Sequence, residues 1–277
     1  PSGNYVWARS FKGQHQSIGY AVKADGANNV YITGSFQETV DFNPGLGTYN
    51  LTSTGGLKDV FLCKLTREGA FIRAFALGGA EDDYASGLVL DDSANVYLTG
   101  RFQYTVDFDP DPVSTANMTS NNLSDVFLSK YDSAGNFVWV NTFGSTGWDM
   151  GMALAIDKAA NLYVGGGYTG TVDFDPDPNN TASLISSGSA TEFFLAKYDR
   201  NGDYIWATGN GSGDGHIRAL APGEYGALYA AGVHTGSGNI TIGATSVDLR
   251  GIGNTDVFIL KFGCDDKSAP SFVQVTT

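Results

Sequence analysis

The chain has 277 residues and a net charge of −13, from 16 Lys and Arg against 29 Asp and Glu. Because like charges repel, this composition argues against nucleic acid and anionic membrane surfaces as partners. No apolar run of about 18 residues occurs, so we expect no membrane-spanning helix.

The composition is typical of an all-β protein built from short strands and tight turns. Glycine occurs 37 times, Asn, Thr, Ser and Tyr are abundant, and apolar runs with a helical period are absent. A chain of this length buries roughly 70 to 75% of its unfolded surface, so it needs no disulfide for stability. The start at Pro1, without the basic and apolar segments of a signal peptide, fits a processed N-terminus.

The first repeat unit predicts four antiparallel strands, which we call a, b, c and d. Strands a and b span residues 19–25 and 29–36 around an Asp-Gly-Ala-Asn turn. After an insert, strands c and d span residues 59–65 and 70–77 around Thr-Arg-Glu-Gly. The strand b sequence Val-Tyr-Ile-Thr-Gly at 30–34 then returns every 66 residues, which indicates one supersecondary unit copied along the chain.

The second and third units repeat this order with similar turns. Their a-to-b turns are Asp-Ser-Ala-Asn-like and their c-to-d turns begin at Asp132 and Asp199. Asp, Asn and Gly stand where a turn needs side-chain hydrogen bonds to the backbone or a positive φ. We therefore interpret these Asp residues as turn formers.

The fourth unit has no recognisable strand d, whereas residues 3–8 resemble strand d of the second and third units at 135–140 and 202–207. The N-terminal strand could therefore complete the last sheet, which is how a β-propeller closes its ring and protects its edges. We predict a four-bladed propeller of four-stranded blades with an N-terminal closing strand. Two alternatives remain: the chain is part of a larger ring, or two chains pair four blades each.

This prediction sets the domain limits. A single propeller domain covers residues 1–263, with blade repeats at about 18–77, 84–143, 150–208 and 216–262 plus 4–11, and residues 264–277 form a tail or linker. Cys63 lies at an apolar strand c position that holds Ser129, Ala196 and Leu260 in the other units, so we expect it to be a small buried hydrophobic side chain. Cys264 opens the tail, where its thiol is either exposed or paired outside this sequence.

The pattern Asp125-Val-Phe-Leu-Ser-Lys-Tyr-Asp-Ser-Ala-Gly-Asn-Phe-Val-Trp139, followed by Phe143-Gly144, resembles the SBBP-type beta-propeller repeats, and the resemblance covers about residues 4 to 262. Such repeats occur in large secreted and cell-surface bacterial proteins, so the resemblance implies a secreted or cell-surface location and further domains of a longer chain. The Thr-Val-Asp-Phe-Asp-Pro insert is similar to the version in Bacteroidota surface proteins. The family supplies no catalytic residue.

The b-to-c inserts and the d-to-a loops share one face of the predicted disc, which we call the insert face. Because the variable loops gather there, we expect binding residues on this face. The inserts carry acids at every second position, which invites a calcium hypothesis, since Ca²⁺ takes clustered carboxylate oxygens. The candidate ligands are Asp107, Asp109, Asp111, Asp173, Asp175 and Asp177. In the alternative, Val and Phe point inward and the carboxylates face solvent.

The d-to-a loops supply the candidate ligand-binding residues. A Trp beside carboxylates could stack on a sugar ring while the acids bind its hydroxyls. The residues are Asp83, Trp148, Asp149, Asp214 and His216. In the alternative, Asp83 and Asp149 fix neighbouring loop amides.

These patterns favour an extracellular, non-enzymatic module for adhesion, for glycan or protein binding, or for assembly of a surface structure. One alternative is a glycan-active hydrolase with carboxylates in the central channel, which needs two acids about 5 to 10 Å apart. A hydrolase would show an unlike pair with one buried acid, whereas a module would show acids that repeat between blades and stay solvated. A third alternative is a calcium-stabilised scaffold.

Overall fold

The computed structural model describes residues 3–188, 190–209, 214–235, 238–242, 245–249, 255–263 and 271–275. In these ranges the chain is built from β-strands, with two short 3-10 turns, η1 (Thr54–Gly56) and η2 (Glu224–Gly226). No helix in this part of the chain is long and apolar enough to cross a membrane. Cys264 and the loop residues 211–213 lie outside the described ranges.

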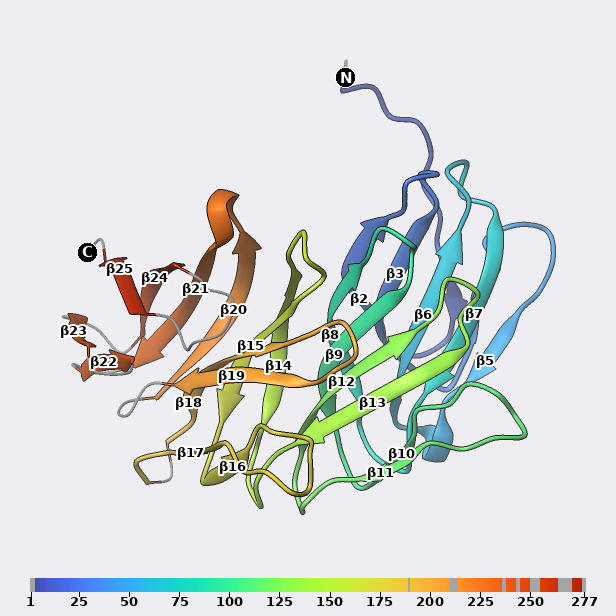
Figure 1. The fold of residues 1–277 in the computed structure, drawn as a ribbon. Coiled ribbons are helices and arrows are strands. Elements are labelled where there is room, and N and C mark those ends of the chain that lie inside the picture. The colour runs from blue at the N-terminus through green and yellow to red at the C-terminus, as the bar shows by residue number, and fades with distance from the viewer. Residues whose placement is uncertain are drawn as a thin grey trace.

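Four antiparallel four-stranded sheets follow one another along the described chain, each with its strands side by side in the order a, b, c, d. Sheet 1 consists of β2 (Ser17–Ala24), β3 (Val30–Gln37), β6 (Lys58–Leu65) and β7 (Phe71–Leu77). Sheet 2 consists of β8 (Tyr84–Leu90), β9 (Val96–Phe102), β12 (Asp125–Tyr131) and β13 (Phe137–Phe143), and sheet 3 of β14 (Met150–Ile156), β15 (Leu162–Tyr168), β18 (Glu192–Tyr198) and β19 (Tyr204–Gly209). Sheet 4 consists of β20 (Asp214–Pro222), β21 (Ala227–Thr235), β24 (Asp256–Gly263) and β25 (Ser271–Val275). In Figure 1 sheet 1 lies at the right of the molecule and sheet 4 at the left. The arrangement fits a propeller-like fold.

Each b-to-c insert folds into a small hairpin below its sheet, as Figure 1 shows for sheets 2 and 3. The hairpins are β4 (Thr39–Asp41) with β5 (Asn50–Thr52), β10 (Thr105–Asp107) with β11 (Asn117–Thr119), β16 (Thr171–Asp173) with β17 (Ser183–Ile185), and β22 (Gly238–Ile242) with β23 (Thr245–Leu249). Strand β1 (Lys12–Gly13) adds to the first hairpin through β4.

The turn aspartates act as predicted. The carboxylate of Asp25 accepts hydrogen bonds from the backbone amides of Ala27 and Asn29 and from the Asn29 side chain. Asp91 and Asp157 form the same bonds in sheets 2 and 3. These bonds satisfy backbone amides in a tight turn, which explains the recurrence of Asp in the sequence.

The glycine that ends the recurrent strand b sequence is explained by a bulge in strand a. The register of strand a shifts in all four sheets, for example between Ala85 and Gly87 in sheet 2. The bulge brings the carbonyl oxygen of Tyr84 so close to Gly100 that a Cβ there would lie 1.8 Å from it. Gly34, Gly166 and Gly232 are equally restricted, so only glycine fits this position.

The core lies between neighbouring sheets. Strand a of each later sheet packs its apolar face on strands b and c of the sheet before it, so that Leu88 shares a cluster with Leu62 and Leu154 shares one with Leu128. Cys63 is buried in the first sheet, and burial raises the pKa of its thiol to about 12, which confirms the prediction of a small buried side chain.

The strand that completes sheet 4 is β25, which pairs antiparallel with β24. The prediction that residues 4–11 supply this strand is wrong. A segment that follows β24 closely in the chain closes a much shorter loop than one at the opposite terminus, so its pairing costs less conformational entropy. The expected tail 264–277 therefore contains a strand of the fourth sheet.

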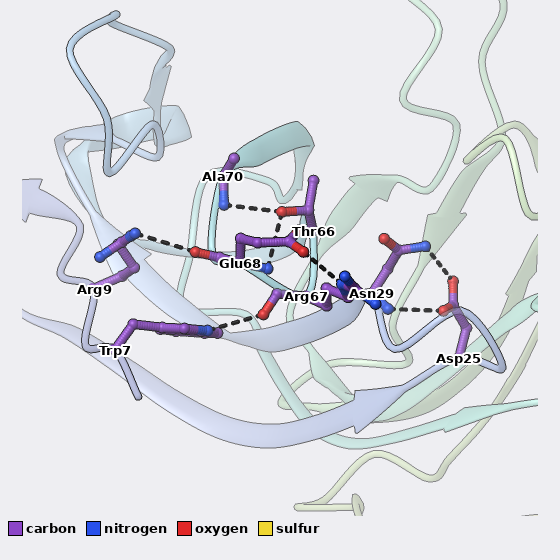
Figure 2. Close-up of polar contacts among 8 residues, drawn as sticks. All are labelled: Trp7, Arg9, Asp25, Asn29, Thr66, Arg67, Glu68 and Ala70. Carbon is purple, nitrogen blue, oxygen red and sulfur yellow. Dashed lines mark hydrogen bonds and ion pairs between the residues drawn. The ribbon is translucent and has the colours of Figure 1, made fainter. Parts of the chain in front are cut away.

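The N-terminal residues instead lie against the c-to-d turn of sheet 1 (Figure 2). The indole N–H of Trp7 donates to the carbonyl oxygen of Arg67 at 2.9 Å, and the Arg9 guanidinium donates to the carbonyl oxygens of Glu68 and Gly69. Residues 3–11 form no strand. They add to the first sheet of the described chain and close no ring.

Candidate functional site

The carboxylates of the acidic inserts accept hydrogen bonds from backbone amides of their own loops. In sheet 2 the Asp107 carboxylate accepts the amides of Asp109 and Ala116, Asp109 accepts the amide of Asp111, and Asp111 accepts the amide of Val113. In sheet 3 the same bonds are formed by Asp173, Asp175 and Asp177. Each carboxylate therefore shapes its own loop.

The alternation that the sequence predicted is present in these hairpins. Val106 and Phe108 are buried, as are Val172 and Phe174 in the third sheet, while the acids between them are partly or fully exposed. Across the described ranges no three His, Cys, Asp or Glu side chains converge as a metal site. The acids instead border open grooves beside the neighbouring strand d: Asp109 and Asp111 line one of about 540 Å³, and Asp175 and Asp177 line one of about 460 Å³.

Asp83 and Asp149 fix loop amides, as the alternative interpretation held. One oxygen of Asp83 accepts the amide of Gly79 at 2.9 Å and the other accepts the amide of Gln103 at 2.9 Å. Asp149 accepts the amides of Ser145 and Thr169 in the same way. Both carboxylates are buried, so neither is accessible to a ligand from solvent in this structure.

Further buried acids stand at the start of strand c. Burial raises the pKa of Asp59 to about 7, although hydrogen bonds from Thr54 act to lower it. At the same repeat position in sheet 2, burial raises the pKa of Asp125 to about 6. Burial also raises the pKa of Asp83 to about 8, and the nearby carboxylates of Asp59 and Asp82 add to this rise. Asp149 shifts in the same direction for the same reason. The shifted acids thus recur in sheets 1 and 2 and their loops.

Trp148, in contrast, is exposed and forms part of a stack with a cation. The guanidinium carbon of Arg101 lies 5.4 Å from the centre of the Trp148 ring and 4.5 Å from the centre of the Tyr84 ring. Trp148 is 43% exposed, and Arg101 and Tyr84 are half-buried. The three side chains come from the loop before sheet 3, from β9 and from β8. We call this group the Tyr84–Arg101–Trp148 stack.

Most N–H donors of the Arg101 guanidinium form no hydrogen bond within the described ranges. Within the described ranges its side chain donates one bond, to the sulfur of Met150 at 3.7 Å, and it forms no ion pair. A guanidinium held between two aromatic faces keeps its in-plane donors available for a planar acceptor. On a chain with a net charge of −13, these donors form a locally positive group whose chemistry suits an anionic acceptor.

Other polar and aromatic side chains surround the stack. The Lys58 ammonium lies 5.4 Å from the Tyr84 ring centre, and the Tyr84 hydroxyl donates to Asp82 at 2.9 Å. Tyr20 packs edge-on against Tyr84 with ring centres 6.4 Å apart, and it is 43% exposed. The surroundings combine a second cation, one carboxylate and an exposed aromatic ring, which suits a ligand with both polar and apolar parts.

The remaining candidates occupy sheet 4. His216 is the third residue of β20 and holds the repeat position of Tyr84 and Met150 in sheets 2 and 3. Burial lowers the pKa of His216. The positive charge of Arg218 lowers it further, whereas the negative charge of Asp214 raises it. No hydrogen bond, ring contact or ion pair in the described chain joins Asp214 or His216 to Trp148. The structure therefore does not unite the predicted residues in one site.

Sequence reasoning found Trp148 but missed Arg101, Tyr84 and Lys58. The signal was a departure from the repeat, because the position of Arg101 holds Ser35, Gly167 and Val233 in the other units. A charged residue in a strand position that is otherwise small or apolar points to a function that the repeat itself does not need.

No family model matches the chain. It is 23% identical over 229 residues to the uncharacterized WD repeat-containing protein L264 of Acanthamoeba polyphaga mimivirus, which covers 73% of this chain and 16% of that protein. It is 30% identical over 148 residues to the regulatory protein FlaEY of Caulobacter vibrioides, covering 53% of this chain and 15% of that protein. The chain thus spans about a sixth of the length of these relatives, and the likeness to a WD repeat-containing protein fits a repeat family of propeller-like fold.

Proposed function

We propose that this chain is a non-enzymatic binding module, working outside the cell or at its surface, that holds an acidic glycan on its insert face. The observation that carries the proposal is the Tyr84–Arg101–Trp148 stack. Its guanidinium fork fits a carboxylate in two parallel hydrogen bonds, and its exposed indole offers a face to a sugar ring.

The buried acids favour binding over hydrolysis. A hydrolase needs an accessible pair of unlike carboxyls beside the scissile bond. Asp59 and Asp125 occupy the same repeat position, and Asp83 and Asp149 do so as well, so the acids with raised pKa values are alike rather than unlike. All four are buried and accept hydrogen bonds from neighbouring backbone amides. These features support a structural role for the four.

Calorimetric titration with an oligosaccharide containing uronic acid, and with its neutral counterpart, tests the proposal. We expect the acidic oligosaccharide to bind and the neutral one not to bind. The Arg101→Lys variant should bind the acidic oligosaccharide at least about tenfold more weakly than the unaltered protein, because a lysine ammonium cannot form the two parallel hydrogen bonds. Trp148→Ala should weaken binding similarly by removing the stacking face.

Arg200→Lys is the matched control, because Arg200 lies in the c-to-d turn of sheet 3, in a groove with the a-to-b turn residues Asp91 and Asp157 that contains none of the three stack residues. It should bind like the unaltered protein. Equal binding of acidic and neutral sugars, or an Arg101→Lys variant that binds as tightly as the Arg200→Lys control, would contradict the proposal.

A further inference from the structure

Sheet 4 exposes the face that the other sheets bury. Tyr229, Val257 and Ile259 are 41%, 77% and 57% exposed. The residues at the same repeat positions in sheets 1 to 3 are at most 3% exposed: Tyr31, Tyr97 and Tyr163; Val60, Val126 and Phe193; Leu62, Leu128 and Leu195. Lys261 stacks on Tyr229 as Lys64 stacks on Tyr31, so this face is built like the buried ones. We call it the end face.

Sheet 1 exposes the opposite face. Val22 on β2 is 61% exposed, whereas Leu88 and Leu154 at the same position on β8 and β14 are buried. Residues of β2 are mostly exposed along its length, while those of β8 and β14 are buried or half-buried. We call the β2 surface around Tyr20 and Val22 the start face.

The start face and the end face are the two halves of one interface. At each junction inside the molecule a strand a leucine packs on the strand c leucine of the sheet before, as Leu88 does with Leu62 and Leu154 with Leu128. At the ends of the described chain each half lacks its counterpart. Contiguous exposed apolar surface of this kind is rare on a monomer and marks an interaction site.

We infer that a second copy of this chain covers both faces, with its end face on the start face of the first copy and its start face on the end face of the first. The new contacts continue an interface that the molecule already forms at each internal junction, with Val22 of one copy in the place of Leu88 and Ile259 of the other in the place of Leu62. Two head-to-tail contacts related by a two-fold axis close a ring.

A second copy accounts for the two faces together. It offers the two missing halves at once and leaves no sheet face uncovered. The ring then holds eight four-stranded sheets, which lies within the usual propeller range of about four to eight. The N-terminal residues do not interfere, because they lie against the turn of sheet 1 formed by residues 66–70 rather than on the start face.

Light scattering coupled to size exclusion tests the inference on the unaltered chain. We expect a molar mass of twice the 29.2 kDa of one chain at micromolar concentration, which corresponds to a dissociation constant of about 1 μM or below. Val22→Lys and Ile259→Glu each place a charge in both junctions of the dimer, so each variant alone should show a twofold lower mass. Both residues are exposed in the single chain, so the variants should fold, which circular dichroism checks.

Mixing separates a head-to-tail ring from other dimers. In an equimolar mixture of the Val22→Lys and Ile259→Glu variants, one junction is unaltered and the other pairs Lys with Glu, so the mass should return to that of a dimer. Val138→Glu is the control, because Val138 is exposed on strand d of sheet 2, outside both faces, and should leave the mass unchanged.

A monomeric unaltered chain would overturn the inference and leave the faces to other blades of a longer protein. So would a dimer that resists one of the two variants, because a start-to-start or end-to-end contact does not involve both faces. A ladder of larger oligomers would show that the ring does not close at two copies.

Discussion

At the scale of single residues, the recurrent glycine of strand b shows how a backbone contact selects an amino acid. Gly100 faces the carbonyl oxygen of Tyr84 at a bulge, and a side chain there would overlap with backbone atoms that other residues hold in place. The sequence displays the recurrence but gives no reason for it. The reason lies in the register shift of strand a, which is visible only in the paired sheet.

Gly100→Ala should therefore lower the free energy of unfolding by about 2 to 4 kcal/mol, because strands a and b of sheet 2 must separate locally to admit the methyl group. Denaturant unfolding measures the loss. Gly26→Ala is the control, since nothing lies within 4 Å of a Cβ at that turn position, and its stability should match that of the unaltered protein. Equal stability of the two variants would show that the bulge adapts.

The buried carboxyls make stability depend on pH. Burial raises the pKa of Asp59 to about 7 and that of Asp83 to about 8, whereas in the unfolded chain both carboxyls have the ordinary aspartate pKa of 3.8. Between these values the folded state binds more protons than the unfolded state, so stability falls as pH rises from about 4 to 8. The slope is at most about 1.4 kcal/mol per pH unit for each group.

Asp59→Asn should flatten this slope in thermal unfolding followed from pH 5 to 8. The matched control is Asp132→Asn. Burial opposes the shift, but hydrogen bonds from Asn136 lower the pKa of Asp132, so this carboxyl is ionised throughout pH 5 to 8 in the folded and the unfolded chain. Removing its charge should therefore leave the slope unchanged. An unaltered protein that becomes more stable as pH rises through this range would contradict the assignment.

At the scale of elements, the insert hairpins are stabilised by their own carboxylates. Asp107 accepts two backbone amides, those of Asp109 and Ala116, and so joins the two sides of its loop. Asp107→Ala leaves both amides without this acceptor and should lower the free energy of unfolding by about 1 to 2 kcal/mol. Asp111→Ala loses one exposed bond and should cost less.

The same hairpins give an expectation for metal removal. Because their carboxylates are occupied by loop amides and do not converge, addition of a chelator should leave the melting temperature unchanged. Differential scanning calorimetry with and without excess calcium checks this. If calcium raised the melting temperature of the unaltered protein but not that of the Asp107→Ala variant, the result would support the alternative of a calcium-stabilised scaffold.

Strands and turns were predictable from the sequence where their signals are local. Alternating apolar residues and the Asp, Asn and Gly of the turns lie within a few positions of one another, so the four strands of sheets 1 to 3 follow from them. The outer strand of sheet 4 did not, because Ser271–Val275 lacks the Gly-Asn-x-Val-Trp pattern of strand d. Which segment pairs with an open edge depends on tertiary contacts that similarity alone does not settle.

The candidate site was predictable only in part for a related reason. The sequence does not show whether Asp83 and Asp149 bind a ligand or accept hydrogen bonds from loop amides. Each accepts one such bond from an amide about 20 residues away in the chain, as Asp83 does from Gln103. Arg101 and Trp148 are 47 positions apart, and only the packing of β9 beside the loop before sheet 3 brings them together.

At the scale of the whole molecule, the described chain is a series of sheets with an uncovered face at each end. The repeat predicts that neighbouring units pack alike, and the exposure of Tyr229, Val257 and Ile259 shows where this packing stops. The Tyr84–Arg101–Trp148 stack comes from sheet 2 and the loop before sheet 3, and Tyr20 of the start face packs against its Tyr84. Assembly is therefore tested at Val22 and Ile259, and ligand binding at Arg101 and Trp148.

Electron microscopy of the unaltered chain at micromolar concentration tests the assembly most directly. We expect class averages of a closed ring with eight sheets around one opening, formed by two copies with two-fold symmetry. Single open arcs of four sheets, or closed discs of four sheets from one copy, would contradict the inferred assembly.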